Sequence, residues 1–466
     1  MLDGVGPIHP LRTHPLRDRL VNEVHARPTM PLTASQSASH LAVVTGEHAA
    51  SEIHDHLVLL CERHRVVPPT AGADYFIADL GTLQLRWERH TEFVSYTFCR
   101  RSGGENPFAE PPIEAVPRNW LATLPGEMLV ALHVSLMQRP EGVSDAETAF
   151  PVTRLFAQES LIDCRMAAGI ATGFTDCHIH ADGFGRILVL MDDEKGPINP
   201  HQTGRMVQRL LEIETYRTMA LLGLPHAREA APRLAEAEQR LGEITTALAA
   251  DASHSGNIDR ETDRALLDRL AGLSAEIERL SSQTSYRFSA TSAYAALVTR
   301  RISELREDRL LGLQTYGEFM ERQLQPAIRT CESVAARQEM LARRLARACQ
   351  MLRARIEVTL QEQNRDLLHS MDQRAHLQLR LQETVEGLSV VAISYYAIAL
   401  IGHVIDALAG VSGRPWLGEV GAGLAVPVVV GIVWIGIRRI RRRIAPAGSG
   451  HRNSWAAPPA LDGTRS

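Results

Sequence analysis

The sequence predicts an α+β domain with a mixed sheet, then a long all-α coiled-coil stalk and a C-terminal two-helix transmembrane hairpin. Three observations predict this fold class: strand-like segments before residue 200, helical spacing of apolar side chains over residues 204–386, and two long apolar runs near the C-terminus. The expected parts are residues 1–38 (N-terminal arm), 39–200 (α+β cytoplasmic domain), 204–386 (stalk), 388–411 and 420–440 (transmembrane helices) and 444–466 (disordered tail).

Composition excludes some classes of protein and favours others. The 466 residues are 45% hydrophobic and 22% charged, which is ordinary for folded protein. The net charge of -4 is too small to hold nucleic acid, so we expect no nucleic-acid partner. The six cysteines are scattered without a CxxC pair, which favours a reducing compartment. The first 20 residues lack the apolar run of a signal peptide, so the N-terminus is expected to stay in the cytoplasm.

The first domain is expected to contain a mixed sheet with at least one helix packed on it. Glycine, proline and aspartate separate short segments that are rich in β-branched and aromatic residues. Along Glu47–His64, apolar side chains share one helical face. The predicted strands are His40–Thr45, Asp74–Leu80, Leu83–His90, Glu92–Cys99, Met128–Met137, Leu161–Thr172 and Gly185–Met191.

The stalk is predicted from heptad-like spacing. Leu234, Leu241 and Leu248 fall seven apart, and Leu266, Leu270, Leu273, Ile277 and Leu280 alternate steps of four and three. The turn formers in residues 251–259 predict an antiparallel helical hairpin. Pro326 is expected to end or kink a helix, after which one helix runs into the bilayer.

One stripe on that last helix contains an asparagine. The stripe includes Leu360, Asn364, Leu367, Met371 and Ala375. Asn364 is either a seam residue that sets register and oligomer number or a solvated residue in an exposed segment.

The C-terminal apolar runs predict a hairpin in a bacterial inner membrane. A spanning helix needs roughly 20 apolar residues; Leu388–Val411 qualifies, and Val420–Ile437 qualifies narrowly. Five arginines at positions 438, 439, 441, 442 and 443 follow the second run, whereas the intervening loop has only Arg414. The excess of positive charge predicts that both termini are cytoplasmic. A buried hairpin in a soluble core is the alternative.

Two groups of residues in the first domain are candidates for ligand chemistry. In TDCHIHADGFGR, His178, His180 and Asp182 would project from one side of a strand and could bind a divalent metal such as zinc. A turn in an exposed hairpin is the alternative. In NEVHARP, Glu23, His25 and Arg27 belong to either an anchoring arm or a ligand loop. His54 and His56 point in different directions on a helix, so we assign them to a solvated face.

His403 and Asp406 are the candidates within the membrane segment. They lie three apart and share a helical face, either as ligand or pore residues or as an interfacial pair near the loop. The sequence contains no Walker A loop, GxSxG elbow or HExxH motif. We therefore predict no catalytic residue and no cofactor.

The segments NEVHARP, TDCHIHADGFGR, GRMVQRLLEIETYRTMALLGLP and RFSATSAYAALVTRRISELRE, with residues 363–396, resemble a known bacterial family. It is the family of predicted membrane-anchored proteins catalogued as domain of unknown function 3422, and the resemblance implies an inner-membrane anchor without implying an activity. The order of domains is also similar to that of CorA-type magnesium channels. Their Gly-Met-Asn signature is absent, since this chain has GHVIDALAG at the corresponding place.

Three functions are compatible with these patterns. The first is a non-enzymatic scaffold that forms a homo-oligomer through the stalk, sits in the lipid bilayer and binds a ligand or protein partner through the sheet domain. The second is an ion channel or transporter with His403 and Asp406 at the mouth of a pore. The third is a metal-dependent enzyme that uses His178, His180 and Asp182.

Overall fold

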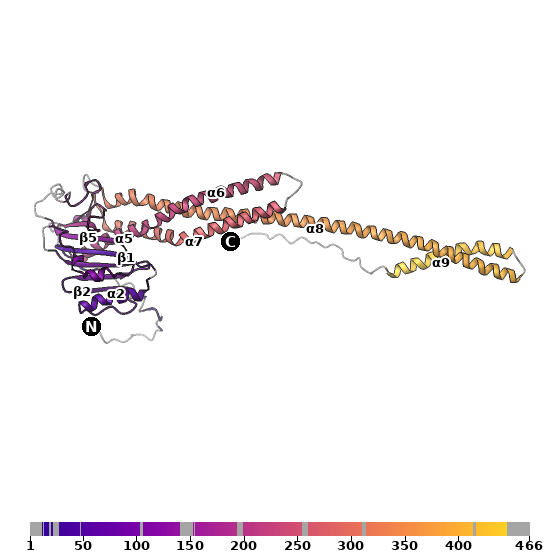
Figure 1. The fold of residues 1–466 in the computed structure, drawn as a ribbon, viewed down its shortest axis with the longest axis horizontal. Helices are drawn as coiled ribbons and strands as arrows, with labels where there is room; N and C mark the ends of the chain where they lie inside the picture. The colour runs from indigo at the N-terminus through magenta and orange to yellow at the C-terminus, as the bar shows by residue number, and fades with distance from the viewer. Residues whose placement is uncertain are drawn as a thin grey trace, which may run out of the picture. The chain divides into compact units, whose positions relative to one another are not determined.

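The chain folds into a sheet domain with covering helices, followed by long helices (Figure 1). The computed structural model describes residues 12, 14–17, 20–21, 28–46, 48–102, 106–139, 152, 154–192, 199–253, 260–309, 314–412 and 416–444. The chain divides into two compact units, Met1–Arg353 and Ala354–Ser466.

The first unit contains an eight-stranded mixed sheet in the order β2-β3-β4-β1-β5-β8-β7-β6. Its strands are β1 (Gln36–Val44), β2 (Tyr75–Asp79), β3 (Gln84–Arg89), β4 (Phe93–Arg101), β5 (Glu127–Gln138), β6 (Ile162–Met166), β7 (Ala171–Thr175) and β8 (Gly185–Met191). Only the β5–β8 pair is parallel; the other neighbouring pairs are antiparallel. The expected mixed sheet is thereby confirmed.

One expected strand is divided in two. Leu161–Thr172 was predicted to be continuous, but β6 and β7 form an antiparallel pair joined at residues 167–170. Ala167, Ala168 and Gly169 have φ angles of 53°, 59° and 86° there. A left-handed conformation at consecutive residues reverses the chain. Alanine adopts this conformation only at an energetic cost, so the apolar sequence pattern did not predict the turn.

Helices cover both faces of the sheet. Leu41 and Val43 of β1 pack with helix α2 (Ala50–Arg63), whereas Ala38 and Ala42 pack in the cluster of helix α5 (Pro200–Leu221). This division follows from the alternation of side chains along a strand. β1 is therefore buried on both faces. The short helices are η1 (Pro112–Ala115), α3 (Arg118–Leu121), η2 (Gln158–Ser160) and η3 (Ala167–Gly169).

The remaining helices are long. They are α6 (Gly223–Ser253), α7 (Arg260–Leu305), α8 (Tyr316–Ser412) and α9 (Trp416–Ile444). Of the two predictions for Pro326, a helix end or a kink, the helix end is wrong, because Pro326 lies inside α8, which is 97 residues long. Its neighbours Leu324 and Ile328 are buried in the sheet-side core, so packing on both sides holds the helix where one backbone hydrogen bond is missing.

The predicted heptad positions of α6 and α7 are buried within the same chain, apart from Leu248, which is half-buried. Leu234, Leu241, Leu270 and Ile277 are at most 2% exposed, and α6 packs against α7 as the predicted hairpin requires. Arg240 pairs with Glu276 across that hairpin, and Arg337 of α8 pairs with Glu238 of α6. The buried side chains of α8 continue beyond the sheet-side core and are Met320, Leu324, Ile328, Cys331, Val334, Gln338, Leu341, Leu345, Ala348 and Leu352.

Candidate functional site

The loop that follows β7 carries the predicted metal trio. Residues 176–184 form a loop, not the strand on which the prediction depended. Asp176 is only 1% exposed; its carboxylate accepts hydrogen bonds from the backbone N–H groups of Ala157 and His178, and lies 3.2 Å from Nε2 of His180. These contacts give the loop its shape.

The trio itself is not brought together. His178 Nδ1 lies 3.1 Å from Ser160 Oγ, while Asp182 pairs with Arg186 at 2.8 Å. Among the residues that the structure describes, no group of three His, Cys, Asp or Glu side chains could hold a metal ion. The physical reason is that residues 176–184 are not a strand and turn at Asp182 and Gly183, so the alternation that would place the three side chains on one side is absent.

The same loop does not form a nucleophilic triad. A triad needs one imidazole that contacts both the hydroxyl and the carboxylate. Here His178 contacts Ser160, and a second histidine, His180, contacts the Asp176 carboxylate. The hydroxyl of Ser160 therefore lacks the carboxylate-oriented base that would activate it.

A buried polar cluster joins this loop to helices α5 and α8. The Glu214 carboxylate accepts hydrogen bonds from the Tyr316 hydroxyl and from Arg217, and the Cys177 thiol lies 3.7 Å away. Burial, followed by the charge of Glu214, raises the pKa of the Cys177 thiol and of the Tyr316 phenol. Both groups are therefore neutral hydrogen-bond donors at pH 7, which suits them to connecting elements and not to nucleophilic attack.

His54 and His56 do not lie on a solvated face as predicted. His56 is 6% exposed, stacks on Trp120 at a centroid distance of 4.5 Å, and its Nε2 lies 3.1 Å from the Trp120 carbonyl oxygen. Nε2 of His54 lies 3.0 Å from the Pro69 carbonyl oxygen. Segments that are distant in sequence cover both sides of α2, and the spacing of residues along the helix does not reveal these contacts.

A polar cleft of about 570 Å³ lies where the end of the sheet meets three helices. The turn between β3 and β4 forms one wall, the first turn of α2 forms another, and α5 with α7 forms the third. The lining residues are Thr45, Gly46, His48, Ala50, Ile53, Asp74, Arg89, His90, Thr91, Tyr216, Tyr294 and Leu297.

Polar groups at this cleft pair with groups of opposite charge, and two tyrosine rings stack on one of its walls. Arg89 Nε donates to Asp74 Oδ1 at 2.8 Å, and His48 Nδ1 lies 2.8 Å from Glu52. Tyr216 and Tyr294 stack at a centroid distance of 5.8 Å. Helix α2 begins without a side-chain cap, so its first N–H groups have no side-chain acceptor. Polar groups of both signs beside an aromatic surface suit recognition of a small polar molecule.

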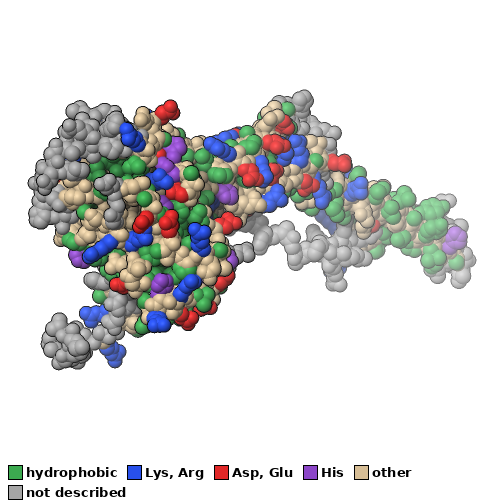
Figure 2. Space-filling model, turned by 60° about the vertical axis from the view of Figure 1, so that its left-hand side comes forward, with side chains coloured by type: hydrophobic (Ala, Val, Ile, Leu, Met, Phe, Trp, Pro, Cys, Tyr) green, Lys and Arg blue, Asp and Glu red, His purple; other side chains and the backbone are tan. Residues whose placement is uncertain are grey.

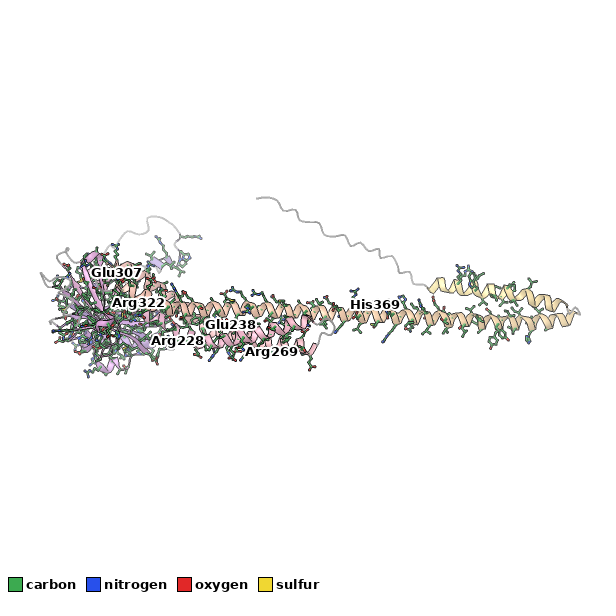
Figure 3. All side chains as sticks on the ribbon, turned by 90° about the horizontal axis from the view of Figure 1, so that it is seen from above. Arg228, Glu238, Arg269, Glu307, Arg322 and His369 are labelled. Atoms are coloured by element: carbon green, nitrogen blue, oxygen red, sulfur yellow. The ribbon has the colours of Figure 1, made fainter. Side chains whose placement is uncertain are left out.

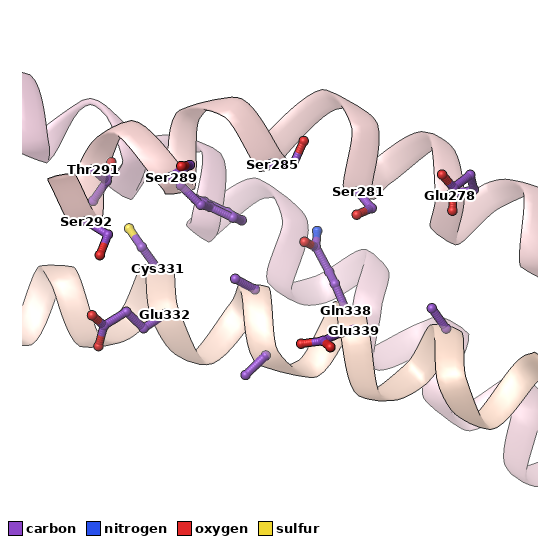
Figure 4. A pocket seen from close by; sticks show the side chains of 14 residues that line it. Glu278, Ser281, Ser285, Ser289, Thr291, Ser292, Cys331, Glu332, Gln338 and Glu339 are labelled. Carbon is purple, nitrogen blue, oxygen red and sulfur yellow. The ribbon is translucent and has the colours of Figure 1, made fainter.

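A second hollow, of about 540 Å³, lies between α7 and α8 (Figure 4). Its lining consists largely of small side chains such as Ser281, Ser285 and Ala335, with Glu278 and Glu339 among them. The lining residues include no lysine or arginine, so the hollow lacks the charged groups of both signs that line the cleft beside α2. The cleft beside α2 is therefore the stronger candidate for a ligand site.

The remaining predicted residues lie elsewhere. Glu23, His25 and Arg27 fall outside the described residues, although the next residue of that arm, Pro28, accepts a hydrogen bond from the Tyr75 hydroxyl. The following Met30 and Leu32 are buried, so this part of the arm packs on the core.

On α8, Asn364 is exposed, and Nδ1 of the exposed His403 lies 2.8 Å from the Ala399 carbonyl oxygen. Asp406 belongs to the same helix, but its side chain is outside the described residues. The sheet domain's cleft is lined by residues of the first unit alone.

Comparison with known families identifies the chain. A family model described as "Protein of unknown function (DUF3422)" matches residues 12–444. The chain belongs to this family. No curated protein and no solved structure gives a match, so the similarity to CorA-type channels stays a prediction from sequence.

Sequence patterns did not reveal the cleft of this family member. Tyr216 belongs to one of the family segments and Tyr294 to another, but they lie on separate helices and meet only in the fold. Asp176 stands within TDCHIHADGFGR, where a single acidic residue before two histidines gave the only signal that it organises the loop.

Proposed function

We propose that this protein is a membrane-anchored, non-enzymatic protein that forms a homo-oligomer and binds a ligand or partner through its sheet domain. One observation carries the proposal. Among the described residues, α8 contains a stretch long and apolar enough to cross a membrane, and only 6% of that stretch is buried (Figure 2). Such exposure in water costs about 25 cal/mol for each Å² of apolar surface, and a bilayer removes this cost.

The two-pass arrangement is part of this proposal. It is supported by α9, whose apolar part Val426–Gly436 precedes the arginine cluster. The guanidinium of Arg438 lies 4.8 Å from the centroid of the Trp434 ring. Tryptophan and arginine together favour a membrane–water interface, and the excess of positive charge favours its cytoplasmic side.

Fractionation tests the anchor. The full chain should stay with membranes after alkaline carbonate extraction and should need detergent for solubility. A reporter inserted at Arg414 should be active only on the periplasmic side, whereas reporters at the two termini should be active in the cytoplasm. A chain that remains soluble without detergent, or a cytoplasmic Arg414 reporter, would contradict the anchor or its topology.

The ligand role is assigned to the cleft beside α2. Thr91 is exposed at its rim, so Thr91→Trp should fill the cleft without disturbing the core. Thr70, which is exposed and does not line the cleft, supplies the matched variant Thr70→Trp. In a thermal-shift screen of polar metabolites, at least one should stabilise the parent and Thr70→Trp but not Thr91→Trp. Equal responses of all three proteins to every compound would refute the assignment.

An ion channel or transporter is the rival proposal. Its support is that His403 is exposed on the apolar part of α8, three positions before Asp406. Reconstituted liposomes should then show cation flux that Asp406→Ala reduces. Absence of flux, or flux that Asp406→Ala leaves unchanged, would remove this alternative.

A further inference from the structure

The apolar side chains of the stalk pack against other helices of the same chain only up to Leu352. Before that residue, α8 packs against α6 and α7, and Thr284 and Gln338 hydrogen bond inside the bundle at 3.2 Å. Glu238 of α6 and Arg269 of α7 belong to this bundle, and His369 lies further along α8 (Figure 3). The heptad seams of α6 and α7, from which the helical hairpin was predicted, are therefore occupied within one chain, and the stripe around Asn364 is left for self-association.

The part of α8 from 360 to 388 leaves large apolar side chains uncovered by any described residue. Leu367, Met371 and Leu381 are 61%, 64% and 67% exposed. The full set of exposed apolar side chains is Leu360, Leu367, Leu368, Met371, Leu377, Leu379, Leu381, Val385 and Leu388. A solvated helix without tertiary packing gains little from propensity alone, so this surface requires a partner.

Six of these nine side chains follow a heptad, whereas Leu368, Leu377 and Leu379 lie outside it. Steps of four and three pass through Leu360, Asn364, Leu367, Met371, Arg374, Gln378, Leu381, Val385 and Leu388. Every seventh residue from 360 to 388 corresponds to a d position, and leucine occupies four of these five positions. The positions opposite the seam are Glu362, His369, His376 and Glu383, all polar. The helix therefore has one apolar edge and one solvent edge over four heptads.

We infer that a second copy of this chain covers this edge in a parallel two-stranded coiled coil over residues 360–388. This inference rests on the proposed membrane-anchored homo-oligomer, because two helices that enter one membrane from the same side must run parallel. Leucine at d and a single asparagine at an a position favour two parallel strands, in which Asn364 meets its own counterpart. The positions beside the seam, such as Gln363, Ser370 and Gln382, carry no charge that would repel an identical helix.

Asn364, Arg374 and Gln378 are the polar residues of the seam, and Arg374 is the charged one among them, which makes the inference sharper. At a d position in a parallel pair, two Arg374 side chains approach each other, which weakens the pair without changing its register. Arg374→Leu should therefore strengthen association, whereas Leu381→Glu should weaken it. Loss of one buried leucine corresponds to a rise in the dissociation constant of roughly tenfold or more.

Disulfide crosslinking of the full chain in native membranes tests the pairing. The parent carries Cys177→Ser and Cys349→Ser, because these two thiols are half-buried, whereas Cys61, Cys99, Cys164 and Cys331 are buried. Single cysteines at Leu360, Leu367, Met371 and Leu381 should each crosslink to the same residue of a second copy. Cysteines at His369 and His376, on the solvent edge, should not. All these positions are exposed in the monomer, so the substitutions leave folding intact.

The possible results separate the alternatives. Crosslinks at every seam position support the parallel pair, whereas crosslinks at one position alone indicate an antiparallel pair and overturn the inference. Crosslinking without periodicity overturns it as well. Mass measurement in detergent should give twice 51.4 kDa, and a monomer or a trimer contradicts the pair. Carbonate extraction of the same samples reports the anchor separately, so failure of the anchor and failure of the pair are distinguishable.

Discussion

Acid should destabilise the sheet domain through His40. This residue lies on β1 and is 5% exposed; its Nδ1 lies 2.8 Å from Thr97 Oγ1 and its Nε2 lies 3.1 Å from Thr215 Oγ1 of α5. Burial, with the positive charge of Arg86 as the second cause, lowers the pKa of His40 to about 3. The folded domain therefore keeps this imidazole neutral at pH values where the unfolded chain protonates it.

The sign and magnitude of the effect follow from proton linkage. Below a pH of about 6.5, the unfolded state binds one more proton at this position than the folded state, so the free energy of unfolding falls by about 1.4 kcal/mol per pH unit. Between pH 6.5 and pH 5, His40 alone should cost about 2 kcal/mol. Burial also lowers the pKa of His133 to about 4, which adds a similar amount over the same range.

Guanidinium unfolding at pH 7, 6 and 5 measures this loss. The buried Trp87 and Trp120 report on the sheet domain by fluorescence in the detergent-solubilised full chain. His40→Gln should reduce the pH dependence by about 1.4 kcal/mol per pH unit, because one linked proton is removed. His369→Gln, on the exposed part of α8, should leave it unchanged. An equal pH dependence in the parent and in His40→Gln would refute the reasoning.

Three further predictions concern packing and reactivity. A Cβ at Gly223 would lie 2.2 Å from Thr291 Oγ1, so Gly223→Ala should lower the free energy of unfolding by about 1–3 kcal/mol. A Cβ at Gly242 would have no atom within 4 Å, so Gly242→Ala should be neutral or stabilising. Thermal melts compare the two variants. Leu270→Ala should cost about 2–5 kcal/mol, because Leu270 is completely buried between helices, and unchanged denaturant midpoints would contradict this packing. Iodoacetamide at pH 7.5 should modify Cys349 before Cys177, because burial and the charge of Glu214 raise the pKa of the Cys177 thiol. Peptide mass mapping checks the order, and faster labelling of Cys177 would contradict its place in the cluster with Glu214.

Local patterning was sufficient to predict most strands and the stalk helices. Gly185–Met191 matches β8, and the leucines at 266, 270 and 273 are buried at the spacing from which their seam was predicted. These features depend on neighbours within one or two turns of chain, so side-chain period and turn residues are enough to specify them. The same reasoning failed at Ala167–Gly169, where backbone conformation and not hydrophobicity reverses the chain.

The remaining features depend on contacts between segments that are distant in the sequence. The parallel pairing of β5 with β8, the burial of His56 against Trp120, and the meeting of Tyr216 with Tyr294 each join residues from separate elements. A heptad shows that a helix has an apolar edge, but it does not show which helix covers that edge. Tertiary packing places α6 and α7 over α8 up to Leu352 and leaves residues 360–388 uncovered, because hydrophobic burial is non-directional and any complementary surface within reach can satisfy it.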